Sequence, residues 1–192
     1  VSKNKKLNIL IIKNITNSLK KSKICINHFY NIGSCEEYYG SKVQLKENSR
    51  LFNYSSYGNY KINIHKYLLK ASKKNKFNYT NLRTFNILGY DRHKKNIVTF
   101  LKSNLNNKKL KLNNINSIRD FMWLDDYLFS IKSILNYNKK KYQAINIGTG
   151  KGTSIQKIIN YISRKKQLNL DNKINNRKIK TEIYNIKIAN NS

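Results

Sequence analysis

The sequence predicts an α/β fold, in which strand-like segments alternate with helix-like segments along the whole chain. Two observations carry this prediction. Apolar residues recur at helical spacing in segments such as 7–20, where positions 7, 10, 11, 15 and 19 would face a core. Between such segments lie short runs rich in β-branched and aromatic residues, such as 23–32 and 142–147, which have the character of buried strands.

The first half of the chain predicts a helix over 7–20, a strand over 23–32, and a polar loop over 40–53 that would close over a site. A second helix over 55–73 follows. Its buried stripe would be Tyr60, Ile64, Leu68 and Ala71. Residues 77–88 then predict one continuous strand.

The second half predicts shorter elements. Helices are expected through 97–105, over 124–135 with Asp125 and Asp126 in the first turn, and over 155–162. Strands are expected over 109–112, 117–122 and 142–147, with a last candidate at 181–188 in a polar tail. The glycine-rich stretch 148–152 is interpreted as a strand-to-helix turn rather than a phosphate cradle, because GxxxxGK[ST] is not matched.

Composition narrows the function classes. The 192 residues contain 39 Lys and Arg against 9 Asp and Glu, a formal net charge of +30, and no proline. The cations are spread along the chain beside asparagines, so drift toward AT-rich codons explains the charge without a partner; a selected basic surface is the alternative. Two cysteines, Cys25 and Cys35, predict neither a disulfide framework nor a zinc site, and no metal is expected. No membrane-spanning or signal segment is expected, and we expect a cytoplasmic location.

A tyrosine and a lysine four residues apart on the second helix suggest chemistry. Tyr57 and Lys61 would share one helix face, where the ammonium would favour the phenolate. Such a phenol can serve as acid or base toward a sugar hydroxyl that Ser34 holds. The same spacing recurs at four other Tyr/Lys pairs. Only Tyr57/Lys61 follows a strand whose carboxyl end presents a hydroxyl, and ligands bind at such ends.

Five motifs then follow one another in order: 33–38 (GSCEEY), 57–61 (YGNYK), 82–86 (LRTFN), 119–126 (RDFMWLDD) and 146–150 (NIGTG). Together they resemble the NAD-dependent epimerase/dehydratase family, the extended short-chain dehydrogenase/reductases that act on nucleotide sugars. The resemblance implies a partial Rossmann-like parallel sheet flanked by helices, with a smaller C-terminal substrate-binding region. It also implies NAD or NADP as cofactor and a nucleotide-sugar substrate.

The resemblance further implies residue roles. Tyr57 would be the catalytic acid/base, Lys61 would lower its pKa and bind the nicotinamide ribose, and Ser34 would orient the sugar hydroxyl. Asn86 and Arg119 would contact the nucleotide-sugar diphosphate, although Arg119 with Asp120 could instead form a simple surface pair. Glu36 matches the glutamate that removes a ring proton in dehydratases. Cys35 stands where some dehydratases have an aspartate, which favours an epimerase or reductase of surface-polysaccharide pathways.

The sequence also departs from the family. The glycine fingerprint and the following acidic residue that seat a dinucleotide are missing from the 192 residues. We therefore expect 1–88 to be the C-terminal half of a Rossmann-type domain that holds the Ser/Tyr/Lys site. Residues 89–192 are expected to be mainly a nucleotide-sugar-binding region, with strands around 117–147 returning to the main domain. A full-length form is expected to be a homodimer.

Two alternatives stay open. The chain could be a truncated, inactive remnant of the same family. It could also be a basic nucleic-acid-binding module, which predicts Lys and Arg clustered on one face with exposed aromatic residues between them. Phe85, Phe121 and Trp123 are expected to face the core instead, which argues against nucleic acid as a partner.

Overall fold

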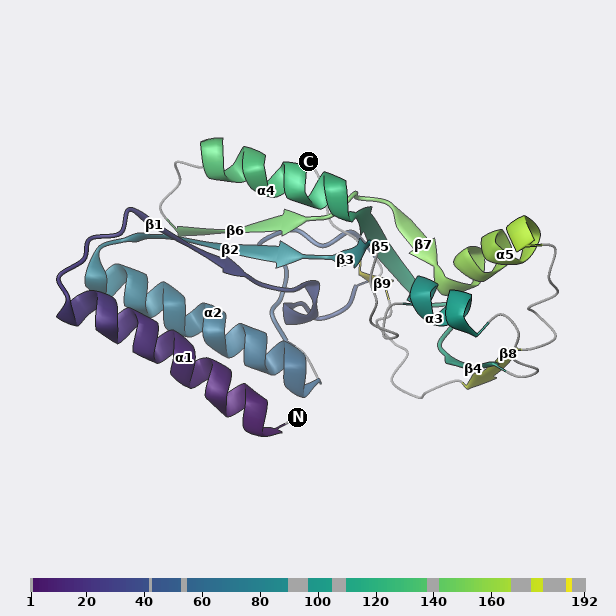
Figure 1. The fold of residues 1–192 in the computed structure, drawn as a ribbon, viewed down its shortest axis with the longest axis horizontal. Helices are drawn as coiled ribbons and strands as arrows, with labels where there is room; N and C mark the ends of the chain where they lie inside the picture. Colours follow the sequence, from purple (N-terminus) through teal and green to yellow (C-terminus); the bar gives the residue numbers. More distant parts are fainter. Residues whose placement is uncertain are drawn as a thin grey trace. The chain divides into compact units, whose positions relative to one another are not determined.

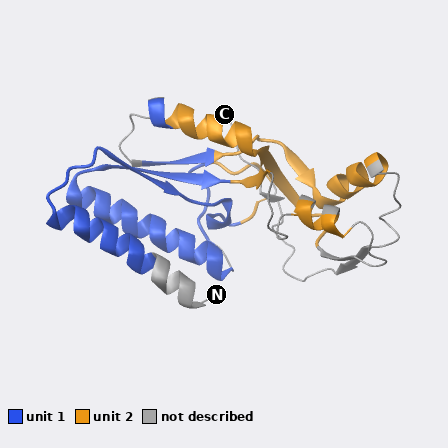
Figure 2. Ribbon diagram, viewed as in Figure 1, with its two compact units in different colours: residues 1–39, 47–84, 135–146 blue, residues 40–46, 85–134, 147–192 orange. Residues whose placement is uncertain are grey.

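The fold comes from a computed structural model that describes residues 2–41, 43–52, 55–89, 97–104, 110–137, 142–166, 174–177 and 186–187. It divides into two compact units, coloured separately in Figure 2. Unit 1 comprises Val1–Tyr39, Glu47–Thr84 and Leu135–Asn146. Unit 2 comprises Gly40–Lys46, Phe85–Ile134 and Ile147–Ser192.

Unit 1 is a small sheet with two long helices. Strands β1 (His28–Ile32), β2 (Asn78–Thr84) and β6 (Tyr142–Ile147) hydrogen-bond in the order β1-β2-β6. β1 and β2 are parallel, and their arrows run the same way in Figure 1. Helices α1 (Ser2–Lys21) and α2 (Ser56–Asn75) lie together below the sheet in that view. This arrangement confirms the predicted α/β class, in which helices flank a parallel sheet.

The core of unit 1 lies between α2 and the sheet. Ile64, Leu68 and Ala71 of α2 are buried against Phe77 and Tyr79, as the helical stripe predicted, while Tyr60 is partly buried beside them. The side chain of Ser55 caps α2 by accepting from the Gly58 N–H at 2.9 Å. Lys76 ends the helix in the left-handed conformation, with φ of 58°. The cap fixes where α2 begins, and therefore where Tyr57 and Lys61 lie.

Unit 2 is built from short elements. Strands β3 (Asn86–Leu88), β5 (Ile118–Trp123) and β7 (Gly152–Ser154) form a sheet in that order, and β9 (Ile186–Lys187) also pairs with β5. β4 (Leu110–Asn113) pairs with β8 (Ile174–Arg177). Helices α3 (Ile97–Ser103) and α5 (Ile155–Lys166) share a core of Leu101, Ile159 and Ile162. Helix α4 (Leu124–Tyr137) begins with Asp125 and Asp126, where carboxylates favour the helix dipole.

Several sequence-based boundaries need correction. The single strand expected over 77–88 is two strands, because Phe85 leaves the β2 ladder and its N–H donates to Ile147 O at 3.0 Å. β3 then pairs with β5, with Asn86 opposite Phe121. Gly152, expected to end a strand-to-helix turn, instead begins the strand β7, and 174–177, expected as polar tail, forms β8. Most of the strand candidate at 181–188, and Leu105 of the third helix, fall outside the described residues.

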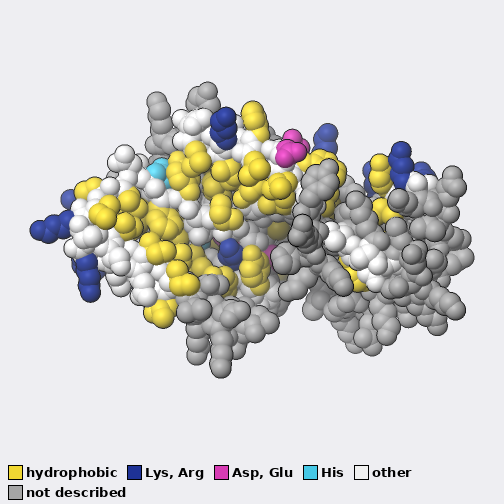
Figure 3. All heavy atoms as spheres, in the orientation of Figure 1, with side chains coloured by type: hydrophobic (Ala, Val, Ile, Leu, Met, Phe, Trp, Pro, Cys, Tyr) yellow, Lys and Arg dark blue, Asp and Glu magenta, His cyan; other side chains and the backbone are white. Residues whose placement is uncertain are grey.

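The expectation for the aromatic residues is wrong for Trp123, whose side chain is 64% exposed. It ends β5 directly after Met122, which is 8% exposed, and neighbouring strand residues point to opposite faces. Phe85 is buried as expected, and Phe121 is partly buried. On the face in Figure 3, the Lys and Arg side chains of the described residues lie at separate places, whereas hydrophobic side chains gather in the middle. None of the described helices combines the length and the apolar character that a membrane crossing requires.

Candidate active site

The candidate site begins where β1 ends. Gly33 and Ser34 follow the last strand residue, and Ser34 caps the short 3-10 helix η1 (Cys35–Glu37). Its Oγ accepts from the Glu36 N–H at 3.1 Å, and its own N–H donates to Glu37 Oε1 at 2.9 Å. Ser34 and Glu37 form a capping box, in which each side chain accepts from the other residue's backbone N–H, and this is why GSCEE turns sharply here. The cap fixes the Ser34 hydroxyl at the carboxyl end of a parallel strand.

Helix α2 brings Tyr57 and Lys61 to the same place. The Ser34 side chain lies near enough to the Tyr57 phenol to favour its ionised form. The Lys61 Nζ lies 5.8 Å from the centre of the Tyr57 ring and donates to Ile32 O at 2.7 Å, so it bridges α2 to the end of β1. Tyr57 is 46% exposed, and a ligand in solvent can therefore reach it. Ser34, Tyr57 and Lys61 thus lie together, as an acid/base site on a sugar hydroxyl would require.

The electrostatics of the pair differ from the sequence-based expectation. The pKa of Tyr57 is raised, mainly because partial burial disfavours the phenolate, while the nearby Ser34 side chain acts in the opposite direction. Burial also lowers the pKa of Lys61, and the nearby Glu37 carboxylate partly offsets that effect. The expected lowering of the Tyr57 pKa by Lys61 is therefore not present in this structure. The ammonium lies beside the ring and binds a carbonyl.

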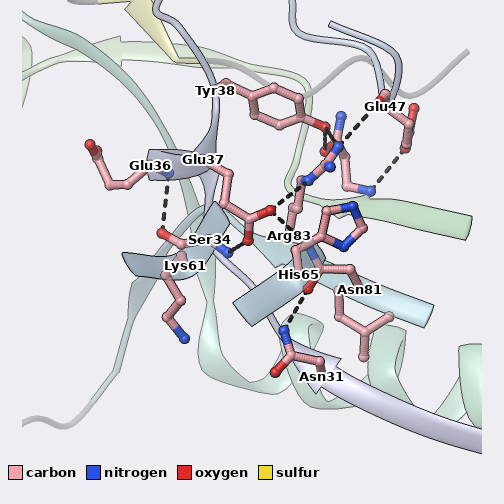
Figure 4. Close-up of polar contacts among 12 residues, drawn as sticks. Asn31, Ser34, Glu36, Glu37, Tyr38, Glu47, Lys61, His65, Asn81 and Arg83 are labelled. Carbon is pink, nitrogen blue, oxygen red and sulfur yellow. Dashed lines mark hydrogen bonds and ion pairs between the residues drawn. The ribbon is translucent and has the colours of Figure 1, made fainter. Parts of the chain in front are cut away.

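The two glutamates of η1 behave differently. Glu36 is partly exposed and extends away from Glu37, on the side opposite to Arg83 (Figure 4). It is near enough to Tyr57 to contribute to the rise in the pKa of that phenol. Glu37 is completely buried and forms an ion pair with Arg83, Oε2 to Nε, at 3.0 Å. Glu36 is thus the glutamate that remains accessible to a ligand.

A polar network that was not predicted from the sequence surrounds Glu37. Besides Arg83 Nε, Glu37 Oε2 accepts from Asn81 Nδ2 at 2.8 Å. Arg83 Nη1 donates to Tyr38 OH at 2.7 Å, and Tyr38 OH donates to Asn146 Oδ1 at 2.6 Å. The signal in the sequence was Arg83, a charged residue inside an otherwise buried strand, which requires a buried partner. The sequence alone does not say which of the two neighbouring glutamates is that partner.

The two residues expected to contact a diphosphate, Asn86 and Arg119, belong to unit 2. Asn86 Nδ2 donates to Asp120 O at 3.1 Å, and Arg119 Nη1 donates to Ile118 O at 3.0 Å. Asp120 is completely buried, so the surface-pair interpretation of Arg119 and Asp120 is wrong. Neighbouring β5 residues point to opposite faces, which explains the different exposure of the two side chains.

Asp120 organises the glycine-rich turn after β6. Its carboxylate accepts from the Thr149 N–H at 2.9 Å and from the Gly150 N–H at 2.8 Å, and also from the Thr149 hydroxyl. Gly150 has φ of 73°, a conformation that glycine adopts without strain. These backbone donors are turned toward a protein carboxylate. The stretch is thus a turn held from inside, although it leads into β7 and not directly into a helix as the sequence predicted.

Metal chemistry has no candidate ligand set in the part of the chain that the structure describes: it contains no group of three or more His, Cys, Asp or Glu side chains that could hold an ion. Neither cysteine is in a disulfide; Cys25 is exposed, and Cys35 is buried next to Ser34. His28, inside β1, is stacked on Tyr30 and hydrogen-bonded to Thr80 Oγ1 at 2.8 Å, which is a packed strand position.

Comparison with known proteins identifies one matching family and many solved structures of the same fold. The family described as NAD dependent epimerase/dehydratase matches residues 3–148. No curated protein matches the sequence. A dTDP-glucose 4,6-dehydratase double mutant from Streptomyces venezuelae, solved with NAD, has a TM-score of 0.84 at 13% identity, with 97% of this chain and 57% of that chain covered.

Two further solved structures are similar to the same extent. UDP-glucuronic acid 4-epimerase from Bacillus cereus has a TM-score of 0.81 at 20% identity, covering 96% of this chain and 59% of that chain. RMD from Pseudomonas aeruginosa, complexed with NADPH, has a TM-score of 0.81 at 18% identity, covering 94% of this chain and 63% of that chain. The likeness at these identities establishes a Rossmann-like fold. The chain spans about 60% of the length of these structures.

Proposed function

The chain belongs to the NAD dependent epimerase/dehydratase family, and from this premise we propose that it acts on a nucleotide sugar, with hydride transfer between the sugar and NAD or NADP. One observation carries the proposal. A partly exposed tyrosine lies near a serine side chain at the carboxyl end of a parallel strand, with a lysine ammonium beside its ring. Four other Tyr/Lys pairs share the spacing in sequence, but this pair lies at a strand end where ligands bind.

The residues present fit the nicotinamide-ribose end of a dinucleotide. An ammonium has three donors, and Lys61 Nζ gives one to Ile32 O, so others can reach ribose hydroxyls, together with the Tyr57 phenol. The 192 residues do not contain the glycine fingerprint that would seat the pyrophosphate. When bound, NAD or NADP accepts the hydride that leaves the sugar carbon, a step that side chains do not perform.

The proposed work of the protein is proton transfer and orientation. As the C–H bond of the sugar carbinol breaks and its hydride leaves, the hydroxyl proton passes to the Tyr57 phenolate, and the carbon becomes a carbonyl. Ser34 holds the hydroxyl within reach of that oxygen. Because the phenolate is the base, and burial raises the pKa of Tyr57, the rate of oxidation should rise with pH. The nearby Ser34 side chain favours the phenolate and opposes burial.

The remaining roles are proposals of the same kind. Glu36, the accessible glutamate of η1, would remove a ring proton if the reaction is a dehydration. Asn86 and Arg119 would bind the diphosphate, for which an arginine fork is well suited. Epimerase, dehydratase and reductase chemistry, whether as an isomerase, a lyase or an oxidoreductase, all use the same acid/base. We propose a cytoplasmic role in the synthesis of surface-polysaccharide sugars, with a homodimer as the working form.

The proposal is tested by assaying the chain against a panel of UDP- and dTDP-sugars with NAD or NADP, following both the reduced nicotinamide absorbance and the sugar products. Tyr57→Phe should reduce turnover by about 10²- to 10⁴-fold, the usual contribution of a general acid/base. Its urea unfolding should change little, because Tyr57 is 46% exposed and the substitution leaves the ring in place. Equilibrium binding of NAD and NADP to the wild-type chain is measured alongside.

Tyr161→Phe is the matched control. Tyr161 and Lys165 have the same spacing on α5, and Tyr161 is 63% exposed, so this variant should retain full turnover. Equal rates for Tyr57→Phe and wild type would refute the role of the phenol. If the wild-type chain neither binds dinucleotide nor turns over any sugar, the enzymatic proposal fails for this chain. Salt-sensitive binding of RNA or DNA in that case would favour the basic binding module instead.

A further inference from the structure

The carboxylate of Glu37 is an unusual group to find in the interior of this protein. Only 9 of the 192 residues are acidic, yet this one is completely buried. A buried carboxylate is costly unless it is paired and hydrogen-bonded. Both carboxylate oxygens of Glu37 accept hydrogen bonds (Figure 4). Oε2 accepts from Arg83 Nε at 3.0 Å and from Asn81 Nδ2 at 2.8 Å, and Oε1 accepts from the Ser34 N–H at 2.9 Å.

Arg83 fixes the direction of that carboxylate. The guanidinium is 2% exposed and lies 4.7 Å above the ring of Tyr38. Its Nη1 donates to Tyr38 OH at 2.7 Å and to Glu47 O at 2.8 Å, so Glu37, Tyr38 and Glu47 together hold the guanidinium. On the other side, Asn81 Oδ1 accepts from Asn31 Nδ2 at 2.6 Å. Because Arg83 and Asn81 are both fixed and both bind Oε2 of Glu37, the other carboxylate oxygen, Oε1, is directed at the Ser34 N–H.

Gly33 supports the same interpretation. A Cβ at this position would lie 2.5 Å from Glu37 Oε1 and 2.7 Å from Asn81 Oδ1, closer than real contacts allow. The absence of a side chain therefore lets the backbone between β1 and η1 come down onto the carboxylate. The Gly33 N–H donates to Leu82 O at 2.8 Å, which continues the β1–β2 ladder to this point. The local backbone is built around the carboxylate.

Stability alone is a weak explanation for the pair. Desolvation offsets most of the attraction in a buried ion pair, and apolar residues of similar volume are often as stabilising. What apolar residues cannot do is accept the Ser34 N–H. Ser34 in turn follows the end of β1, where Lys61 of α2 binds Ile32 O beside the Tyr57 ring, and its hydroxyl is near enough to that phenol to favour the phenolate.

We propose that Glu37 is a positioning residue: backed by Arg83 and Asn81, it holds the Ser34 backbone so that the serine hydroxyl meets Tyr57. Glu37 does not touch the reacting atoms in this scheme, because it is completely buried beneath η1. Its catalytic consequence rests on the proposed function. Its geometric consequence, the Ser34–Tyr57 contact, does not.

The test reads the ionisation of the phenol directly. Tyr57 is replaced by 3,5-difluorotyrosine, which ionises near neutral pH, and its ¹⁹F signal is titrated in the full chain. Ser34→Ala should raise the pKa, because it removes a hydroxyl that favours the phenolate. Glu37→Gln should also raise it, since the amide nitrogen now faces donors and cannot keep all three bonds. In the Ser34→Ala background, Glu37→Gln should add no further rise.

The direction in which Glu37→Gln changes the pKa of the phenol distinguishes a positioning role from a purely electrostatic one. Removing a negative charge near a phenol favours the phenolate, so a purely electrostatic Glu37 predicts a lower pKa in Glu37→Gln, with or without Ser34. A purely structural Glu37 predicts an unchanged pKa, as in the control Thr16→Val, which removes a buried hydrogen bond between α1 and α2. Either result would overturn the proposal. The titration needs no turnover, so it is independent of the proposed function.

Two further measurements complete the test. If Glu37→Gln does not fold, Glu37→Met with Arg83→Met removes both charges at similar volume and should still raise the pKa of the fluorinated phenol. An unchanged or lowered value in that folded pair would also overturn the proposal. In the natural tyrosine background, Glu37→Gln should lower kcat about tenfold or more at neutral pH with little change in KM. The rate should recover at higher pH, where a merely unfolded fraction would not regain activity.

Discussion

Replacing Tyr38 by phenylalanine should cost stability at neutral pH, and this cost should disappear at high pH. The Tyr38 side chain is completely buried. Its hydroxyl accepts from Arg83 Nη1 at 2.7 Å and donates to Asn146 Oδ1 at 2.6 Å, so Tyr38→Phe removes both bonds and leaves the ring in place. Arg83 Nη1 retains Glu47 O as an acceptor, whereas Asn146 loses the phenolic donor. At neutral pH we expect a cost of about 2 kcal/mol in the free energy of unfolding.

The pH dependence follows from burial, which raises the pKa of Tyr38 to about 12, whereas a tyrosine in the unfolded chain ionises near 10. The unfolded state therefore loses its proton first. The contribution of the neutral phenol is complete below about pH 10 and is lost as the pH rises toward 12. Two pKa units at about 1.4 kcal/mol each correspond to about 3 kcal/mol, which exceeds the hydrogen-bond advantage at neutral pH.

Urea unfolding, followed by far-UV circular dichroism from pH 7 to pH 11.5, measures this difference between wild type and Tyr38→Phe. The other tyrosines and the lysines titrate in both proteins and cancel in the difference. We expect a wild-type advantage of about 2 kcal/mol below pH 9.5 that falls to near zero by about pH 11.5. A difference that stays constant, or grows, across this range would show that Tyr38 is not held neutral by burial.

Two further substitutions test local parts of the structure. Gly33→Ala should destabilise the chain by about 1–3 kcal/mol in urea unfolding, because the new Cβ would lie 2.5 Å from Glu37 Oε1. The control Gly89→Ala should cost less, because its Cβ would lie 3.3 Å from Leu124. A larger cost for Gly89→Ala than for Gly33→Ala would contradict the close approach at Gly33. Asp120→Ala should cost about 3 kcal/mol and accelerate hydrogen exchange at the Thr149 and Gly150 amides, which lose their acceptor; unchanged protection there would mean that the turn does not depend on Asp120.

The sequence was sufficient for the α/β class, for the longer helices and for the Tyr57/Lys61 pair, because all three depend on local patterns. Helical spacing located the buried stripe of α2, and the strand before it located Ser34. The break at Phe85 could not be predicted, since β propensity is similar on both sides of it. What separates β2 from β3 is the choice of partner, with Phe85 bonded to Ile147 and Asn86 opposite Phe121.

The difference between Glu36 and Glu37 shows the same limit at the site. The two side chains are chemically identical and adjacent, so no local pattern says which one is buried. The answer depends on Arg83, which comes from β2 and is 46 positions further along the chain. The exposure of Trp123 was missed for a related reason. An aromatic residue at the end of a strand points to whichever face the alternation dictates, and its hydrophobicity does not decide that.

The use that this protein makes of its acidic residues has a consequence for natural sequence variation. Glu37, Glu47 and Asp120 each accept a hydrogen bond from a backbone amide, those of Ser34, Asn146 and Thr149 respectively. A lineage whose codons shift steadily toward lysine and asparagine would shed anions wherever they are dispensable. Positions 37, 47 and 120 should therefore keep their acidic residues. A deep mutational scan should find them the least tolerant of substitution among the nine acidic positions.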